Sequence, residues 1–136
     1  MAVRSNDGMD ELSTTSKNQI CMLKNNRIEK MILDPQAIGL QKGDKSDIQI
    51  SSKEDAIKSF VTVLDGSANK TKIEITALNA AGGLIVSDIA DSFTDAVELT
   101  LNAIHSGKAF DKLENFVKNC GDIKKLEEVK KLWRTY

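Results

Sequence analysis

The sequence has one histidine and two cysteines, and these small numbers exclude several kinds of site. Because His105 is the only histidine, neither a histidine-based metal cluster nor a Ser-His-Asp triad is predicted. Its position just before Gly107 is typical of a capping or surface residue in the last turn of a helix. Cys21 and Cys120 are far apart and have neither the pattern of a disulfide framework nor the spacing of metal ligands, which favours a reducing, cytoplasmic compartment.

The chain also lacks an excess of charge of either sign and a long uninterrupted apolar run. Its formal net charge is −1, so no overall field attracts nucleic acid or an anionic membrane. The apolar run over residues 73–90 contains Glu74, Asn79 and Asp88, and a charge inside a membrane span costs roughly 3 kcal/mol. We therefore expect a buried helix there and no membrane partner. The polar N-terminus shows no signal peptide.

The strand signals come first in the chain. Residues 2–3 are a short strand whose neighbours are expected elsewhere. Residues 18–23 and 27–33 are rich in β-formers and predict a hairpin around the intervening lysine and two asparagines. Pro35 ends the second strand because proline cannot donate to a ladder. Residues 36–52 are expected to form an irregular loop.

Four to five helices are predicted to follow, each with clear start or stop signals. Ser51 with Glu54 and Ser92 with Asp95 have the spacing of a capping box. Glycines then end three of the helical patterns. Five helical segments are predicted: one from the Ser51 signal to Gly66, one over residues 69–89, one from Ser92 to Gly107, one from Ala109 to Gly121, and one from Asp122 through Trp133.

This organisation predicts an incomplete α/β domain. The 136 residues, 40% hydrophobic and 29% charged, suit one globular domain. However, a hairpin and a short strand make a poor sheet for so many helices, and a two-stranded ribbon is marginal alone. We interpret residues 1–136 as a single partial domain, the C-terminal part of a mixed-sheet α/β domain. Exposed sheet edges favour association, including a homo-oligomer. A self-sufficient α+β domain with a small sheet is the alternative.

Two adjacent acids near the N-terminus are the candidate site. Asp7 and Gly8 predict a turn, because glycine accepts positive φ and aspartate can bond its own backbone. Asp10 and Glu11 follow this turn at once. Mg²⁺ is usually held by one or two carboxylates together with phosphates and waters, so the pair suits this ion. The alternative is that both acids favour the start of a helical turn or lie solvated on the surface.

Four blocks of the chain resemble anthranilate phosphoribosyltransferase, an enzyme family of the tryptophan pathway. Residues 3–13 (Val-Arg-Ser-Asn-Asp-Gly-Met-Asp-Glu-Leu-Ser) are similar to its signature Val-His-Gly-x-Asp-Gly-Leu-Asp-Glu-x-Ser. Residues 33–40 are similar to its Leu-x-Pro-x-x-Phe-Gly-Leu block, and residues 78–81 (Leu-Asn-Ala-Ala) and 104–113 continue the likeness. The blocks stand in the family's order, cover nearly the whole chain and match the C-terminal two-fifths or so of such an enzyme.

The chain departs from the family pattern at two places. Arg4 stands where the family commonly has histidine, which alters the phosphate neighbourhood. Residues 13–17 (Ser-Thr-Thr-Ser-Lys) lack the usual Gly-Pro-Thr ending, which alters the loop after the acids. Neither departure touches Asp10 and Glu11.

The resemblance implies a reaction and a cofactor. It implies transfer of a phosphoribosyl group from phosphoribosyl pyrophosphate to anthranilate, with Asp10 and Glu11 as ligands of Mg²⁺. The family's Gly-Thr-Gly-Gly-Asp loop, its Lys-His-Gly-Asn segment and its anthranilate-contacting arginine have no match here. No catalytic or substrate-binding residue is therefore assigned. The isolated chain is expected to be inactive without the missing N-terminal portion of the polypeptide as its partner.

Two other functions stay open. The chain could be a non-catalytic scaffold or interaction module of the same fold, or a relative of the pyrimidine nucleoside phosphorylases, which share the fold. The Asp-Gly-Met-Asp-Glu block favours the phosphoribosyltransferase. Gly82 and Gly83 indicate close helix packing and not a phosphate loop, because helical periodicity runs through them. Asn79 is expected to be a satisfied buried amide and not a ligand contact.

Overall fold

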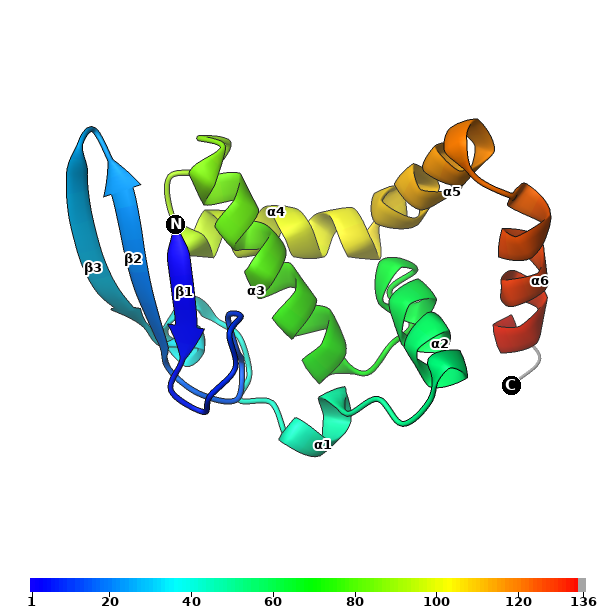
Figure 1. Cartoon of the computed structure of the whole chain (residues 1–136), viewed down its shortest axis with the longest axis horizontal. Coiled ribbons are helices and arrows are strands. Elements are labelled where there is room, and N and C mark those ends of the chain that lie inside the picture. Colours follow the sequence, from blue (N-terminus) through cyan, green and yellow to red (C-terminus); the bar gives the residue numbers. More distant parts are fainter. Residues whose placement is uncertain (135–136) are drawn as a thin grey trace. The chain divides into compact units, whose positions relative to one another are not determined.

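A computed structural model describes the backbone of residues 1–134 and the side chains of residues 1–131 (Figure 1). It contains three strands, a short 3-10 helix and six α-helices, so the predicted order of an N-terminal strand and hairpin followed by helices is confirmed. The described chain forms two compact units, whereas the sequence predicts one partial domain. The first unit comprises Met1–Gln49 and Asn69–Leu101, and the second comprises Ile50–Ala68 and the chain from Asn102.

The sheet of the first unit has the order β1-β2-β3 and is antiparallel throughout. Its strands are β1 (Ala2–Ser5), β2 (Asn18–Lys24) and β3 (Arg27–Leu33). Asn25 and Asn26 turn the hairpin with φ of 52° and 58°, the backbone that a two-residue turn with the twist of the strands requires. The hairpin prediction is confirmed. The neighbours of β1 were expected elsewhere, but its first neighbour is β2, and its other edge is unpaired in the part of the chain that the structure describes.

The two faces of the sheet differ sharply in burial. Side chains alternate between faces along a strand. On the first face Ser5, Asn18, Ile20 and Leu33 are buried in the unit's core. On the second face the alternate positions are mostly exposed. The helices of the unit therefore cover one face of the sheet.

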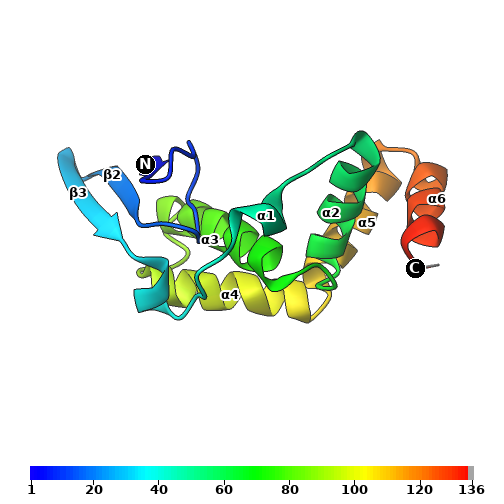
Figure 2. The ribbon, with the colours of Figure 1, turned by 90° about the horizontal axis from the view of Figure 1, so that it is seen from below.

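Helix α3 (Lys70–Val86) is the central element of the first unit, as its apolar sequence predicts. Ala77, Leu78 and Ala81 are fully buried in the core. Helix α4 (Phe93–His105) lies beside α3, and the Thr100 hydroxyl donates to the Ala77 carbonyl at 3.1 Å (Figure 2). No helix among the described residues is both long and apolar enough to cross a membrane.

The sequence predicts close helix packing at Gly82 and Gly83 of α3, and the structure shows it at Gly82 only. A Cβ at Gly82 would lie 3.2 Å from Met1 Cε and 3.5 Å from Leu12 Cδ1, so close packing is confirmed there. A Cβ at Gly83 would meet nothing within 4 Å, so packing does not require glycine at that position.

The second unit consists of helices, and the serine predicted to cap its first helix is one residue too early. It contains α2 (Lys53–Leu64), α5 (Lys108–Cys120) and α6 (Ile123–Arg134). In the first unit, the predicted pairing of Ser92 with Asp95 before α4 is confirmed, since the Ser92 hydroxyl accepts from Asp95 N at 3.1 Å and donates to Asp95 Oδ2 at 2.7 Å. The Ser51–Glu54 box is wrong by one residue, because the Ser52 hydroxyl accepts from Asp55 N at 3.0 Å. The Trp133 side chain of the predicted last helix lies outside the described residues.

The region expected to be irregular, residues 36–52, contains two single-turn helices. These are η1 (Pro35–Ile38) and α1 (Lys45–Ile48). An aspartate caps each, Asp34 accepting from Gln36 N and Asp44 from Ser46 N. Four residues are too few to show an apolar period, so side-chain caps define turns that the sequence pattern does not.

Replacing Leu78 by alanine is expected to lower the free energy of unfolding by about 2–5 kcal/mol, because its side chain is fully buried in the core. Leu99→Ala is the matched control, since this helical leucine is 48% exposed and should cost about 1 kcal/mol or less. Urea unfolding followed by circular dichroism measures both. Equal losses for the two variants would contradict the assignment of α3 as the central helix.

Candidate functional site

The candidate site begins at the turn that follows β1. Ser5 N donates to Met9 O at 2.9 Å and Gly8 N to Ser5 O at 3.2 Å. Gly8 has φ of +94°, a conformation that favours glycine. The predicted Asp7-Gly8 turn is therefore present, and Asp10 and Glu11 follow it directly in the chain.

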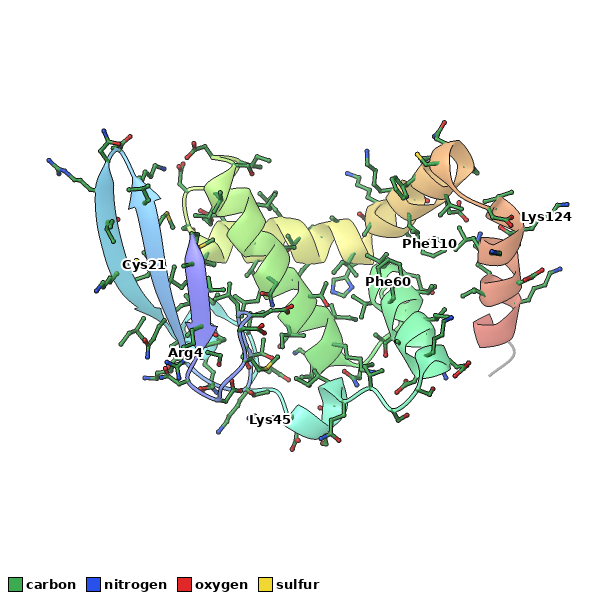
Figure 3. All side chains as sticks on the ribbon, viewed as in Figure 1. Arg4, Cys21, Lys45, Phe60, Phe110 and Lys124 are labelled. Carbon is green, nitrogen blue, oxygen red and sulfur yellow. The ribbon has the colours of Figure 1, made fainter. Side chains whose placement is uncertain are left out.

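Asp7 is the charged centre of this turn. Its carboxylate accepts hydrogen bonds from Met9 N at 3.4 Å, from Ser13 Oγ at 3.1 Å and from Thr15 Oγ1. Lys45 of α1, which is labelled in Figure 3, donates to the Asp7 carbonyl at 3.1 Å, and its Nζ lies 3.9 Å from Asp7 Oδ2. The sequence indicated only the bond from Asp7 to its own backbone. The contacts to residue 45 and to the loop after the acids were missed, because they join segments that no local pattern connects.

The environment of Asp7 stabilises its ionised form. Burial raises the pKa of the Asp7 carboxyl, but hydrogen bonds from neighbouring groups outweigh burial and lower that pKa from 3.8 to about 2. The donors are, in order of their effect on this pKa, the Ser5 hydroxyl, the Thr15 hydroxyl, Met9 N and the Ser13 hydroxyl. The turn therefore holds a permanent negative charge above about pH 4.

Asp10 and Glu11 are both exposed and stand side by side in the chain. Neither makes a hydrogen bond or an ion pair with another described residue, so their oxygens are not committed to protein partners. Within residues 1–131, no group of three or more His, Cys, Asp or Glu side chains is arranged to hold a metal ion. Two free carboxylates are a partial ligand set, and such a set suits Mg²⁺, which takes its remaining ligands from phosphates and waters.

Asn79 of α3 fixes the backbone directly after the two acids. Its Oδ1 accepts from Leu12 N at 3.0 Å, and its Nδ2 donates to Leu12 O at 2.7 Å. Nδ2 also donates to the Ile75 carbonyl at 2.9 Å, which anchors the amide to its own helix. The Leu12 side chain is buried in the core. The expectation that Asn79 is a satisfied amide is confirmed, although the residue is only partly buried, and its partner proves to be the candidate site itself.

A second asparagine holds the loop that follows. Asn18, which is fully buried, accepts from Ser13 N at 2.7 Å and donates to Ser13 O at 2.9 Å. In the sequence, residues 13–17 stand out only as a departure from a family pattern. An asparagine beside a run of serines and threonines is a known signal for local side-chain bonds to the backbone, and it could have been used.

The other residues that the sequence singles out do not take part in the candidate site. His105 is exposed in the last turn of α4, as a surface role requires. Cys21 and Cys120 are free thiols. Arg4 lies on β1 opposite Gln19 and is exposed, on the sheet face opposite to buried Ser5. None of these side chains joins the acid pair in a hydrogen bond.

Comparisons with known proteins agree with this arrangement. The sequence profile of the family described as "Glycosyl transferase family, a/b domain" matches residues 1–110. The chain is 56% identical over 129 residues to a protein of Nitrosopumilus maritimus named anthranilate phosphoribosyltransferase, a match that covers 95% of this chain and 37% of the relative. The chain therefore spans little more than a third of the length of this relative.

Solved structures show the same fold. The chain is similar to anthranilate phosphoribosyltransferase from Saccharomyces cerevisiae in complex with 4-fluoroanthranilate, with a TM-score of 0.72 and 24% identity over 85% of this chain and 34% of that one. A structure of the yeast enzyme in complex with PRPP and Mg gives a TM-score of 0.68 and 23% identity, covering 85% of this chain and 32% of that one. At these identities the likeness establishes the fold alone.

Asn79→Leu is expected to lower the free energy of unfolding by about 2–4 kcal/mol, because it leaves the N–H and C=O of buried Leu12 without partners. Asn102→Leu in exposed α4 sequence is the matched control and should change stability by about 0.5 kcal/mol or less. Chemical denaturation measures both variants. A loss no greater than that of the control would show that the amide does not hold the acid segment.

Asp7→Asn is expected to make stability less dependent on pH. The folded-state pKa of Asp7 is lowered, so its contribution of about 2 kcal/mol is present above about pH 4 and is lost as the pH falls toward 2. Unfolding free energies between pH 2 and pH 6 should therefore converge for the two proteins at the acid end. Asp10→Asn, at an exposed acid, is the control and should follow the unmodified chain. Parallel curves for Asp7→Asn and the unmodified chain would contradict the lowered pKa.

Proposed function

Since the chain belongs to the glycosyl transferase family with an α/β domain, we propose that it is the C-terminal part of an anthranilate phosphoribosyltransferase. The resemblance seen in the four sequence blocks is confirmed by relatives that carry this name, including one at 56% identity. Those names favour the phosphoribosyltransferase over a pyrimidine nucleoside phosphorylase. The unpaired Cys21 and Cys120 suit a cytoplasmic biosynthetic enzyme.

The proposed reaction moves a phosphoribosyl group from phosphoribosyl pyrophosphate to the amine of anthranilate. As pyrophosphate departs, the ribosyl carbon gains oxocarbenium character, so catalysis consists of holding the sugar and neutralising the leaving charge. Mg²⁺, when bound, supplies the positive charge that the pyrophosphate oxygens need. Asp10 and Glu11 are the residues of this chain that would hold it.

The observation that carries the proposal is that the acid pair is free while its backbone is fixed. Asp10 and Glu11 are exposed and have no protein partner, but Asn79 bonds both polar backbone groups of Leu12, the next residue. On the other side, the Asp7 turn fixes the approach from β1. Carboxylates presented in this way are prepared for a cation at little cost in conformational entropy.

The chain alone is proposed to be inactive. It spans only about 37% of its Nitrosopumilus relative, and the sequence lacks the glycine-rich pyrophosphate loop, the Lys-His-Gly-Asn segment and the anthranilate-contacting arginine of the family. These groups would come from the portion of the polypeptide that precedes the matched part. The same short span supports the second candidate, a non-catalytic interaction module that has kept the scaffold.

Co-expression of this chain with the preceding portion of the Nitrosopumilus relative is expected to restore turnover, measured as loss of anthranilate fluorescence with phosphoribosyl pyrophosphate and Mg²⁺. Asp10→Ala and Glu11→Ala should each reduce the rate at least about 10-fold, since even second-layer partners of metal ligands cost 10- to 100-fold. Asp91→Ala, at an exposed acid outside the site, is the matched control.

The outcomes separate the two candidates. Equal rates for Asp10→Ala, Glu11→Ala and Asp91→Ala would refute the metal assignment. No turnover by a complex shown to be folded would favour the interaction module. Turnover by the chain alone would contradict its proposed incompleteness.

A further inference from the structure

Asp7 is the third acid of the block that carries Asp10 and Glu11, and the structure sets it apart from them. The side chain of Asp7 is 12% exposed, whereas Asp10 and Glu11 are exposed residues. Among the side chains that the structure describes, no three acids, histidines or cysteines come together as a metal site. Asp7 is therefore not arranged as a third ligand beside the acid pair, and its burial has another role.

The oxygens of Asp7 already accept hydrogen bonds from the protein. Oδ1 accepts from Met9 N at 3.4 Å, and Oδ2 accepts from Ser13 Oγ at 3.1 Å and from Thr15 Oγ1. Lys45 Nζ lies 3.9 Å from Oδ2 as well. A carboxylate oxygen has two acceptor sites, so both sites of Oδ2 are filled, and a divalent cation at this oxygen would also meet the Lys45 ammonium. The carboxylate is thus engaged with the chain and not open to a metal.

These bonds join the two ends of one loop. We call residues 7–15 the acid loop: Asp7 stands at its start, Ser13 and Thr15 stand at its end, and the acid pair lies between them. The Asp7 carboxylate accepts a hydrogen bond from the hydroxyl of each of the two residues at the far end. Ser13 Oγ also accepts from Thr15 N at 3.0 Å, which fixes this hydroxyl. Tying the base of a loop removes conformations that its tip would otherwise sample, so the backbone of the acid pair is restricted before any ligand binds.

Lys45 holds the same turn from a separate segment of the first unit. It belongs to α1 and donates to the Asp7 carbonyl at 3.1 Å (Figure 1). Helix α1 is itself bound to the start of α3, since the Thr71 hydroxyl donates to Asp47 Oδ2 at 2.8 Å and Asn69 Nδ2 donates to the Asp47 carbonyl at 3.1 Å. The start of the acid loop is therefore anchored to the helices, and the side-chain bonds of Asp7 extend this anchorage to the end of the loop.

We propose that Asp7 is a positioning residue for the acid pair, closing the acid loop so that the two free carboxylates are held ready for one divalent cation that Asp7 itself does not contact. This role rests on the proposed function, in which Asp10 and Glu11 hold Mg²⁺. A carboxylate suits it because both of its oxygens accept, whereas the amide of an asparagine has one accepting oxygen and would lose the bond to one end of the loop. A loop that is ordered beforehand binds its ligand at a smaller cost in entropy.

The first test removes the tie and keeps the charge of Asp7. Ser13→Ala with Thr15→Val deletes the hydroxyl donors at the end of the loop, and Thr76→Val, which deletes an exposed hydroxyl of α3, is the matched control. The order parameters S² of the Asp10 and Glu11 amides, from ¹⁵N relaxation of the metal-free chain, are expected to fall from about 0.85 to below about 0.6 in the double variant. They should stay unchanged in the control.

The second test measures binding of Mn²⁺, a probe for Mg²⁺, from the loss of the electron paramagnetic resonance signal of the free ion. The double variant Ser13→Ala with Thr15→Val is expected to raise the Kd at least about 10-fold, the loss typical of removing a group that orients a metal ligand. Asp7→Glu, which keeps the charge but moves it by one methylene group, is expected to weaken binding too. Thermal melting checks that each variant folds, and Thr15→Val alone replaces the double variant if that variant does not.

The outcomes separate positioning from direct binding and from simple attraction of charge. Tighter Mn²⁺ binding by the double variant would show that a released Asp7 is a ligand, and an unchanged Kd beside weaker binding in Asp7→Asn would show only an attracting charge; either result would overturn the proposal. So would S² values that do not change, or that are already below about 0.6 in the unmodified chain.

The metal assignment of the proposed function has its own readout. It fails if Asp10→Ala binds Mn²⁺ as tightly as the unmodified chain, or if the unmodified chain binds none. In that case the S² values alone decide whether Asp7 closes the acid loop, because they are measured without metal.

Discussion

The contact between the Asn79 amide and the backbone of Leu12 is the constraint on which the candidate site depends. The two residues are 67 positions apart, and the contact ties the segment after β1 to the central helix of the first unit. Without it, the exposed acids would sit on a loop with few ties to the core, and ordering them around a cation would cost conformational entropy. With it, a buried leucine and a satisfied amide hold the backbone while the carboxylates remain in solvent. The rest of the site, including the charged turn at Asp7, is built around that fixed segment.

Much of the fold was readable from the sequence because its signals are local. Two asparagines between β-rich runs define a hairpin, serine and aspartate at a spacing of three define the start of α4, and glycine ends α4. The wrong predictions of secondary structure each concern only one residue or one helical turn. Ser52 and not Ser51 caps α2, because two adjacent serines carry the same signal. The single-turn helices η1 and α1 fall below the length at which an apolar period can be seen.

The candidate site was readable only in part, for a different reason. Asp10 and Glu11 stand out by their adjacency and by a family motif, and the free state of their side chains agrees with a metal-binding role that remains a proposal. Asp7 and Asn18 were missed as structural centres because their partners are hydroxyls and backbone groups of a neighbouring loop, and Lys45 lies far along the chain. Asn79 was correctly expected to be satisfied, but no pattern in one sequence reveals which backbone satisfies it.

The absence of a side chain at Gly82 leaves space beside the segment that carries the two acids. The glycine lies one helical turn after Asn79 on α3, and the side chains of Met1 and Leu12 approach the place where a methyl group would stand. A methyl group there would lie 3.5 Å from Leu12 Cδ1, an ordinary van der Waals contact, and 3.2 Å from Met1 Cε, the tighter contact and the end of a flexible side chain. A helix usually positions a neighbouring segment by the bulk that it presents. Here the missing side chain leaves room for the end of the Met1 side chain, so an added carbon atom at Gly82 would be accommodated first by movement of Met1 Cε and not by the backbone that carries the carboxylates.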